Sequence, residues 1–183
     1  MDIPFNELAR LSYGEPSRFG KKYEATAITP LKEMAALLSE NPDVSLFVEL
    51  KEESLGRFGT EPMVRAVMEA IEPVMERCIA ISFATAPLVE AKRRGWQKTG
   101  WVVRRYNDES RKTAESLSPD YLFCNHEKIS LLPGALWKGN WKWALYEITD
   151  PALAEKWFGL GADMIETMQI AEMLNFFRGK GVV

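Results

Sequence analysis

The sequence predicts an α/β domain in which about six parallel strands alternate with amphipathic helices. Three observations support this: short β-rich runs recur along the chain, a helix-start signal follows most of them, and the intervening segments carry one apolar face. We expect strands at residues 44–50, 78–83, 100–104, 120–124, 142–148 and 162–167. This alternation favours right-handed crossovers, and hence either a doubly wound sheet or a (β/α) barrel.

Helix-start signals precede several of the segments between these strands. The signals combine an Asn, Asp or Thr oxygen with proline or an acidic residue in the first turn. They lie at Thr29-Pro30, at Thr60 before Glu61-Pro62, at Asn107-Asp108 and at Asp150-Pro151. The segment over about 61–76 places its apolar residues on one stripe, which predicts a helix that packs on the sheet.

The composition indicates one folded domain over residues 1–183. The chain is 46% hydrophobic, which is enough for a real core, and its net charge of -3 argues against a nucleic-acid partner. Cys78 and Cys124 lie in apolar surroundings without CxxC spacing, so we expect free thiols rather than a disulfide. No apolar run approaches the ~20 residues of a transmembrane helix, and the N-terminus lacks a secretory signal, which predicts a cytoplasmic location.

The first expected strand contains two charged residues in an otherwise apolar run. Glu49 and Lys51 interrupt the segment Val44–Lys51, and side-chain alternation along a strand puts both on one face. Buried charges need a partner, a metal or a ligand. The pattern therefore predicts that something binds there.

Polar residues also follow the other five strands. Because ligands of α/β folds sit at the carboxyl ends of the strands, these residues are candidates for a site. They are Ser82 and Thr85, Arg104, Asn125 and His126, Glu147 and Thr149, and Glu166 and Thr167. Such a ring could hold a divalent cation and a phosphate group, or it could consist of solvated loop residues with an internal ion pair.

Five segments in order resemble the glycerophosphodiester phosphodiesterase family over roughly residues 25–175. They are Phe47-Val-Glu-Leu-Lys51, Ile81-Ser-Phe83, Gly100-Trp-Val-Val103, Tyr146-Glu-Ile-Thr-Asp-Pro151 and Gly161-Ala-Asp-Met-Ile165. The resemblance implies a TIM-type barrel and a phosphoric diester hydrolase of lipid metabolism. Such an enzyme uses Ca²⁺ or Mg²⁺ and a histidine pair to cleave a glycerophosphodiester into an alcohol and glycerol 3-phosphate.

The resemblance also implies roles for four residues. Glu49 matches a metal ligand, and Lys51 matches a catalytic charge partner of the phosphate and metal. Phe83 ends the Ser-Phe strand, and Tyr146 occupies a position where the family commonly has tryptophan near the substrate. Both are expected to bind substrate.

The chain departs from the family pattern at its start. The family opens with a strand ending in His-Arg-Gly, a Glu-Asn-Thr helix start, a Glu-x-Asp strand and a later His-Asp pair, and this sequence has none of them. The first two βα units are therefore expected to be absent, with Met1 part-way through the pattern, so that the barrel is incomplete. Thr149 and Met168 depart from the family as well, because asparagine and aspartate are common at these positions.

These departures leave two functions open. The single histidine, His126, lies between Asn125 and Glu127 and matches neither family histidine, so an acid–base pair is not evident. The chain is thus either a weakly active or inactive phosphodiesterase domain, or a non-catalytic relative that binds a partner. Six strands leave two sheet edges exposed, and a second copy of the chain could cover the open side.

Two further clusters are expected to be structural. Trp137, Trp141 and Trp143 favour burial against helices, with indole nitrogens bonded to nearby carbonyls, over a carbohydrate platform. The arginines at 93, 94, 104 and 105 fit a solvated helix face and an exposed strand end better than a phosphate site.

Overall fold

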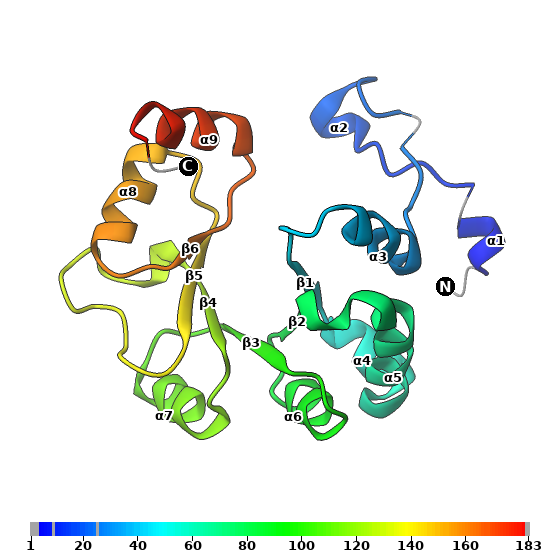
Figure 1. Cartoon of the computed structure of the whole chain (residues 1–183), viewed down its shortest axis with the longest axis horizontal. Helices are drawn as coiled ribbons and strands as arrows, with labels where there is room; N and C mark the ends of the chain where they lie inside the picture. Colours follow the sequence, from blue (N-terminus) through cyan, green and yellow to red (C-terminus); the bar gives the residue numbers. More distant parts are fainter. Residues whose placement is uncertain (1–3, 9, 25, 182–183) are drawn as a thin grey trace.

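One parallel sheet of six strands forms the centre of the computed structural model, which describes residues 4–8, 10–24 and 26–181 (Figure 1). The strands are β1 (Leu46–Glu49), β2 (Cys78–Ser82), β3 (Lys98–Val103), β4 (Tyr121–Asn125), β5 (Lys142–Tyr146) and β6 (Met164–Ile165). Each pairs in parallel with its neighbour in the sequence, in the order β1-β2-β3-β4-β5-β6. All six predicted strands are confirmed, although β6 is only two residues long.

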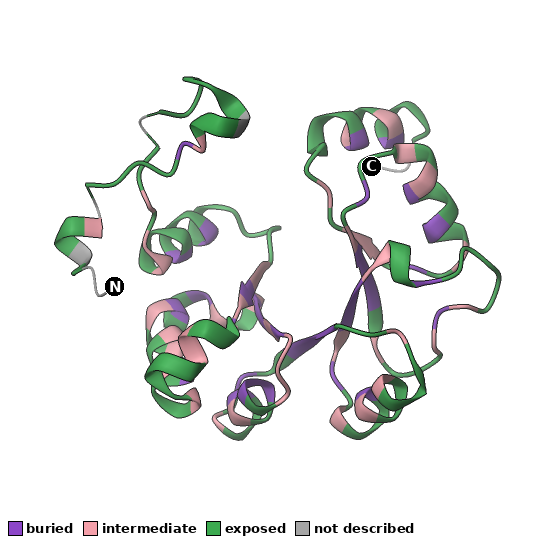
Figure 2. Ribbon diagram, turned by 180° about the vertical axis from the view of Figure 1, so that it is seen from behind, coloured by how far each residue is buried: buried purple, intermediate pink, exposed green. Residues whose placement is uncertain are grey.

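The helices from α3 onward lie around the outside of the curved sheet, whereas α1 and α2, which precede them in the chain, stand away from it (Figures 1 and 2). The helices are α1 (Phe5–Leu8), α2 (Pro16–Phe19), α3 (Leu31–Glu40), α4 (Glu52–Phe58), α5 (Thr60–Ile71), α6 (Ala86–Arg93), α7 (Asp108–Leu117), α8 (Pro151–Gly159) and α9 (Ile170–Gly179), with 3₁₀ turns η1 (Glu72–Arg77) and η2 (His126–Lys128). The architecture confirms the predicted incomplete TIM-type barrel. Met1, where the family pattern was expected to be cut, lies outside the described residues.

The observed first residues of the helices test the helix starts that the sequence predicts. Asn107 caps α7 by accepting a 2.9 Å hydrogen bond in the first turn, and Asp150 caps α8 in the same way. Both predictions are confirmed. The Thr60 prediction is wrong by one residue, since Gly59 precedes α5 and Thr60 is already helical. Pro73 lacks a backbone N–H, and the segment predicted as one helix continues there as η1.

Two apolar layers hold the sheet. The larger one lies between the sheet and the helices and includes Trp96 and Trp157, each 1% exposed. The smaller one fills the concave side, where the Phe47 ring lies 5.3 Å from the rings of both Tyr121 and Phe123 in edge-on contacts. Because Phe47 belongs to β1 and the other two to β4, the sheet curls far enough for these strands to meet across its interior.

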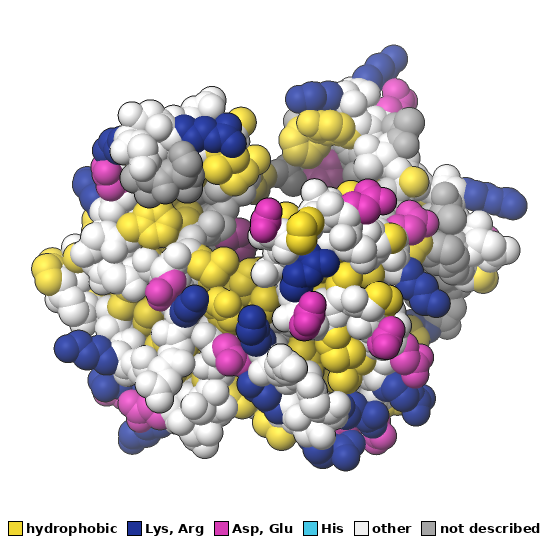
Figure 3. Space-filling model, in the orientation of Figure 1, with side chains coloured by type: hydrophobic (Ala, Val, Ile, Leu, Met, Phe, Trp, Pro, Cys, Tyr) yellow, Lys and Arg dark blue, Asp and Glu magenta, His cyan; other side chains and the backbone are white. Residues whose placement is uncertain are grey.

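The concave side stays open between β1 and β6. These two strands pair with β2 and β5 respectively and not with each other. Figure 1 shows α3 on the β1 side of this opening and α8 with α9 on the β6 side. Hydrophobic side chains are visible between these ends in Figure 3, with acidic and basic side chains beside them.

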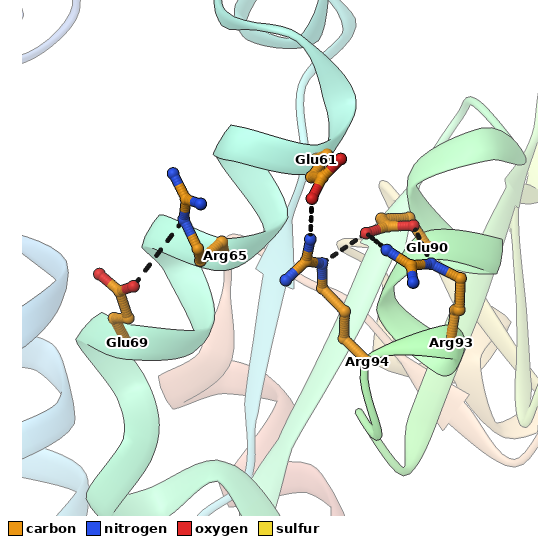
Figure 4. A network of polar contacts seen from close by, with 6 residues as sticks. All are labelled: Glu61, Arg65, Glu69, Glu90, Arg93 and Arg94. Atoms are coloured by element: carbon orange, nitrogen blue, oxygen red, sulfur yellow. Dashed lines mark hydrogen bonds and ion pairs between the residues drawn. The ribbon is translucent and has the colours of Figure 1, made fainter.

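An ion network joins α5 to α6 on the outer surface (Figure 4). Glu90 accepts hydrogen bonds from Arg93, at 2.7 Å, and from Arg94, and Arg94 also contacts Glu61 of α5. Charge-assisted hydrogen bonds from the two arginines lower the pKa of Glu90 to about 2. The solvated helix face expected for Arg93 and Arg94 is therefore an organised network between two helices.

The tryptophan cluster makes the predicted indole hydrogen bonds, but only Trp143 is buried, and Trp137 and Trp141 are half-buried. Trp143 is buried and donates its indole N–H to the Trp137 carbonyl at 3.0 Å, and Trp141 donates to the same carbonyl at 3.3 Å. The Trp137 ring stacks on Tyr106 at 4.1 Å between centroids. These contacts fix the segment that leads into β5.

The remaining structural expectations concern thiols and the membrane. Cys78 and Cys124 are buried free thiols, as predicted, and burial raises the pKa of Cys124 to about 11. Over the described part of the chain, none of the helices has the length and apolarity that a bilayer crossing requires.

Candidate functional site

The carboxyl ends of the strands bring polar side chains to one mouth of the partial barrel. Side chains alternate along a strand, so a polar residue that comes two positions after an interior apolar residue lies on the same face as that residue. Glu49 follows Phe47 in this way, and Glu166 follows Met164. Asn125 and Tyr146 continue the interior face of β4 and β5, and they are register partners. The interior layer is thus apolar in its depth and polar at its mouth.

Glu49 and Lys51 form an ion pair at this mouth. Lys51 Nζ lies 3.2 Å from Glu49 Oε2, so the predicted sharing of a face is confirmed. The expectation that both charges are buried is wrong, because the Lys51 side chain is 64% exposed and that of Glu49 is 32% exposed. Lys51 stands just beyond the strand, where it precedes α4 and reaches back to Glu49 from solvent. A pair this exposed contributes little to stability and can open to a ligand.

Glu147 is held by an unusual backbone conformation at the end of β5. Its φ of 65° lies in the left-handed region, which a residue with a Cβ rarely adopts. The conformation breaks the alternation, and Asn125 Nδ2 donates a 2.6 Å hydrogen bond to Glu147 Oε2. Strained backbone of this kind persists where the surrounding structure fixes it, often at functional sites.

Three carboxylates influence one another at the mouth. Partial burial raises the pKa of Glu166, and the negative charges of Glu147 and Glu49 raise it further. Glu166 is nevertheless exposed to solvent on one side, so the shift is moderated by water. In the part of the chain that the structure describes, neither Glu147 nor Glu166 pairs with a cationic side chain, in contrast to the ion pair that was one expectation for them.

The oxygen atoms at the mouth are of the type that binds a hard divalent cation, but they do not form a complete coordination site. Carboxylate and amide oxygens are the ligands that Ca²⁺ and Mg²⁺ prefer, and their mutual repulsion would be relieved by such an ion. Among the described residues, however, no three acidic, histidine or cysteine side chains lie close enough to hold a metal. Glu49 would have to leave Lys51, and Glu147 would have to share its carboxylate with Asn125.

Phe83 and Tyr146, the predicted substrate-binding residues, both line the interior layer near the mouth. Phe83 is half-buried directly after β2, where Ser82 Oγ donates a 2.7 Å hydrogen bond to the Leu50 carbonyl and ties the ends of β2 and β1 together. The guanidinium of Arg104 lies 4.4 Å from the centre of the Phe83 ring. Tyr146 is also half-buried, and burial raises the pKa of its hydroxyl group. Their roles toward a substrate stay predictions.

His126 opens the short turn η2 after β4 and is half-buried. Within the described chain it has no ion pair or hydrogen bond through its ring. The structure does not bring it into contact with Glu49 or Glu166. Its position gives no support to a histidine acid–base pair.

The sequence interpretation missed one contact at the mouth. Arg104, after β3, pairs with Glu52 in the first turn of α4, and Lys128 Nζ donates a 3.0 Å hydrogen bond to the Arg104 carbonyl. α4 was not predicted, although Glu52-Glu53 after the strand and Gly59 at its end are helix-start and helix-stop signals.

Comparison with known proteins identifies similar folds. No family model and no curated protein matches the sequence. Among solved structures, an Oleispira antarctica phosphodiesterase in complex with the product sn-glycerol-3-phosphate is 22% identical, with a TM-score of 0.77 over 96% of this chain and 71% of that chain. A glycerophosphodiester phosphodiesterase from Parabacteroides distasonis is 15% identical, with a TM-score of 0.76 over 98% of this chain and 73% of that chain. At these identities the likeness shows that the chain has the fold of these phosphodiesterases, as part of their barrel.

Proposed function

We propose that this chain is a glycerophosphodiester phosphodiesterase domain that binds a divalent cation and a glycerophosphodiester at the mouth of its partial barrel. The observation that carries the proposal is that the Glu49–Lys51 pair stands at the end of the barrel where such folds bind ligands, near enough to Glu166 for the charge of Glu49 to raise the pKa of Glu166. The order of the family-like segments and the fold likeness both support it.

Each residue has a chemical role in this proposal. Glu49 would hold the cation, and the same ion would give a counter-charge to Glu166, whose pKa is raised by burial and by the charges of Glu147 and Glu49. A bound cation would neutralise charge on the phosphoryl oxygens. Lys51, freed from Glu49, would offer its ammonium to the same phosphate group, and Phe83 and Tyr146 would form the apolar walls against the glycerol and alcohol moieties.

Hydrolysis by this chain alone is expected to be slow. Acid–base catalysis contributes typically 10²–10⁴-fold, and the one histidine of the sequence makes no hydrogen bond or ion pair through its ring with a described carboxylate. We therefore keep a second candidate, a non-catalytic relative that binds a partner. The observation that favours it is the same lack of a histidine pair.

An activity assay with a binding arm separates the two candidates. Release of glycerol 3-phosphate from glycerophosphoethanolamine would be measured with and without CaCl₂ or MgCl₂, alongside calorimetric titration with each salt. The hydrolase proposal expects metal-dependent release that is lost in Glu49→Gln and kept in Glu172→Gln, an exposed carboxylate on α9. Release that is undetectable, or equal in Glu49→Gln and the parent chain, would leave the binding relative as the better candidate.

A further inference from the structure

A hollow of about 320 Å³ lies beside the ends of β2 and β3, against the first turns of α7. Two adjacent arginines and two aromatic residues give it a basic and partly apolar lining. We call it the arginine hollow, defined by Phe83, Trp101, Arg104, Arg105, Glu109 and Ser110.

The two arginines are in different states. Arg104 is engaged by Glu52 and by the ring of Phe83. Arg105 is exposed and has no ion pair or hydrogen bond from its side chain within the described residues. The hollow therefore contains one guanidinium whose donors are free for an anionic group.

The environment of the Phe83 ring argues against a ligand whose only charged group is a cation bound over that ring. A quaternary ammonium group binds over the face of an aromatic ring, but the guanidinium of Arg104 already lies 4.4 Å from the Phe83 centroid. A second cation at this ring would meet the charges of Arg104 and Arg105. Glu109 also lines the hollow, so a ligand with one ammonium beside its acidic group would find a partner for each charge.

The hollow adjoins the site of the proposed function. Glu49 pairs with Ile81 in the sheet register, and Phe83 follows Ile81 by two residues just as Lys51 follows Glu49. A diester whose phosphate group contacts Lys51 would thus have the Phe83 end of the hollow one strand away. The alcohol part of such a diester would extend toward this end of the hollow.

We propose that the arginine hollow recognises a glycerophosphodiester whose alcohol carries a carboxylate, as a serine head group does. Arg105 binds the carboxylate, and Glu109 accepts from the ammonium. This inference rests on the proposed function, because it takes the diester as the ligand of the mouth.

Two diesters that differ by one carboxylate provide the test. Glycerophosphoserine and glycerophosphoethanolamine would be titrated into the chain in the presence of CaCl₂, with the dissociation constants taken from amide chemical shifts. We expect the serine diester to bind about three- to tenfold more tightly, as for one charge-assisted hydrogen bond weakened by solvent. In Arg105→Gln the ratio should fall toward one. In Arg111→Gln, an exposed arginine of α7 outside the hollow, it should persist.

The outcomes distinguish this inference from the proposed hydrolysis. Equal binding of the two diesters, no binding of either, or a ratio that survives in Arg105→Gln would overturn the role of the hollow. Release of glycerol 3-phosphate measured on the same samples tests the hydrolase separately. Arg105-dependent binding without release of glycerol 3-phosphate would support recognition by the arginine hollow and reject the hydrolase proposal. Release without a preference for the serine diester would support the hydrolase proposal and reject recognition by the hollow.

Discussion

Asn125 Nδ2 donates a hydrogen bond of 2.6 Å to Glu147 Oε2, and this contact joins the ends of β4 and β5 at the mouth of the barrel. It fixes the carboxylate of a residue whose φ is 65° and keeps its charge near Glu166. The amide neutralises no charge. The Glu147 charge therefore adds to the effect of burial in raising the pKa of Glu166, and an incoming cation would oppose both effects.

The first prediction concerns Glu166. Its pKa is raised in the folded state, so its contribution to stability is full below its unfolded value of about 4.5 and is lost as the pH rises through the folded value. At about pH 7 without metal, Glu166→Gln should therefore raise the melting temperature by about 1–3 °C, and the gain should vanish at about pH 4. The same melting temperatures would also be measured by calorimetry in the presence of CaCl₂.

With the salt present, the parent chain should gain more stability than Glu166→Gln, because a cation that binds only the folded state stabilises it. A matched Glu172→Gln chain controls for the removal of any surface carboxylate. A melting temperature of Glu166→Gln that stays at the parent value at about pH 7 would show that ionised Glu166 is destabilised neither by burial nor by the charges of Glu147 and Glu49.

The sequence predicts the fold better than the mouth for a physical reason. The βα alternation and the caps Asn107 and Asp150 are local signals, readable within a few residues. α4 was missed because it is short and has no buried residue, so its apolar pattern is weak. The proximity of Glu166 to Glu49 depends on how far the whole sheet curls. The φ of Glu147 depends on a contact that the register between β4 and β5 makes possible. Neither is encoded in a local pattern.

The second prediction concerns the tie between β1 and β2. Ser82 is fully buried, its Oγ donates to the Leu50 carbonyl at 2.7 Å, and it accepts from the Ala84 N–H at 3.2 Å. Ser82→Ala leaves both backbone groups without this partner and should cost about 1–2 kcal/mol in urea unfolding. Ser39→Ala removes a comparable bond, 3.1 Å to the Ala35 carbonyl, from an exposed position and should cost far less. Equal costs would mean that the tie does not support the mouth.

The third prediction concerns the interior layer at Gly100. A Cβ there would lie 2.9 Å from Phe123 Cε2 and 3.0 Å from Ile81 Cγ2, both in the packed interior of the barrel. Gly100→Ala should destabilise the chain by about 1–3 kcal/mol through overpacking. Gly159→Ala, at the end of α8, meets no atom within 4 Å and should be neutral or stabilising by up to about 1 kcal/mol. Chemical denaturation of both variants measures the contrast, and a neutral Gly100→Ala would indicate a loosely packed interior.

The fourth prediction concerns the network between α5 and α6. The pKa of Glu90 is lowered to about 2, so its stabilising contribution is present above the unfolded value of about 4.5 and is lost as the pH falls through about 2. Glu90→Gln should lower the melting temperature at neutral pH, and the deficit should shrink in strong acid and in high salt. Glu69→Gln removes a carboxylate that lies 4.0 Å from Arg65 and should have a smaller effect. A deficit that is independent of pH would point to lost packing instead of lost charge.

The fifth prediction concerns the open side of the barrel. β1 and β6 each have one strand neighbour in the described chain, and Val44 before β1 and Ile170 after β6 are 51% and 57% exposed. Unpaired strand edges with apolar side chains nearby favour association, so we expect two copies to cover this side. Light scattering across a concentration series should show a dimer, and Val44→Glu with Ile170→Glu should shift it toward the monomer. Val89→Glu, at a residue of α6 that is equally exposed at 57%, should not. A monomer at every concentration would show that the curled interior packing, with Phe47 against Phe123, is sufficient to keep the edges apart.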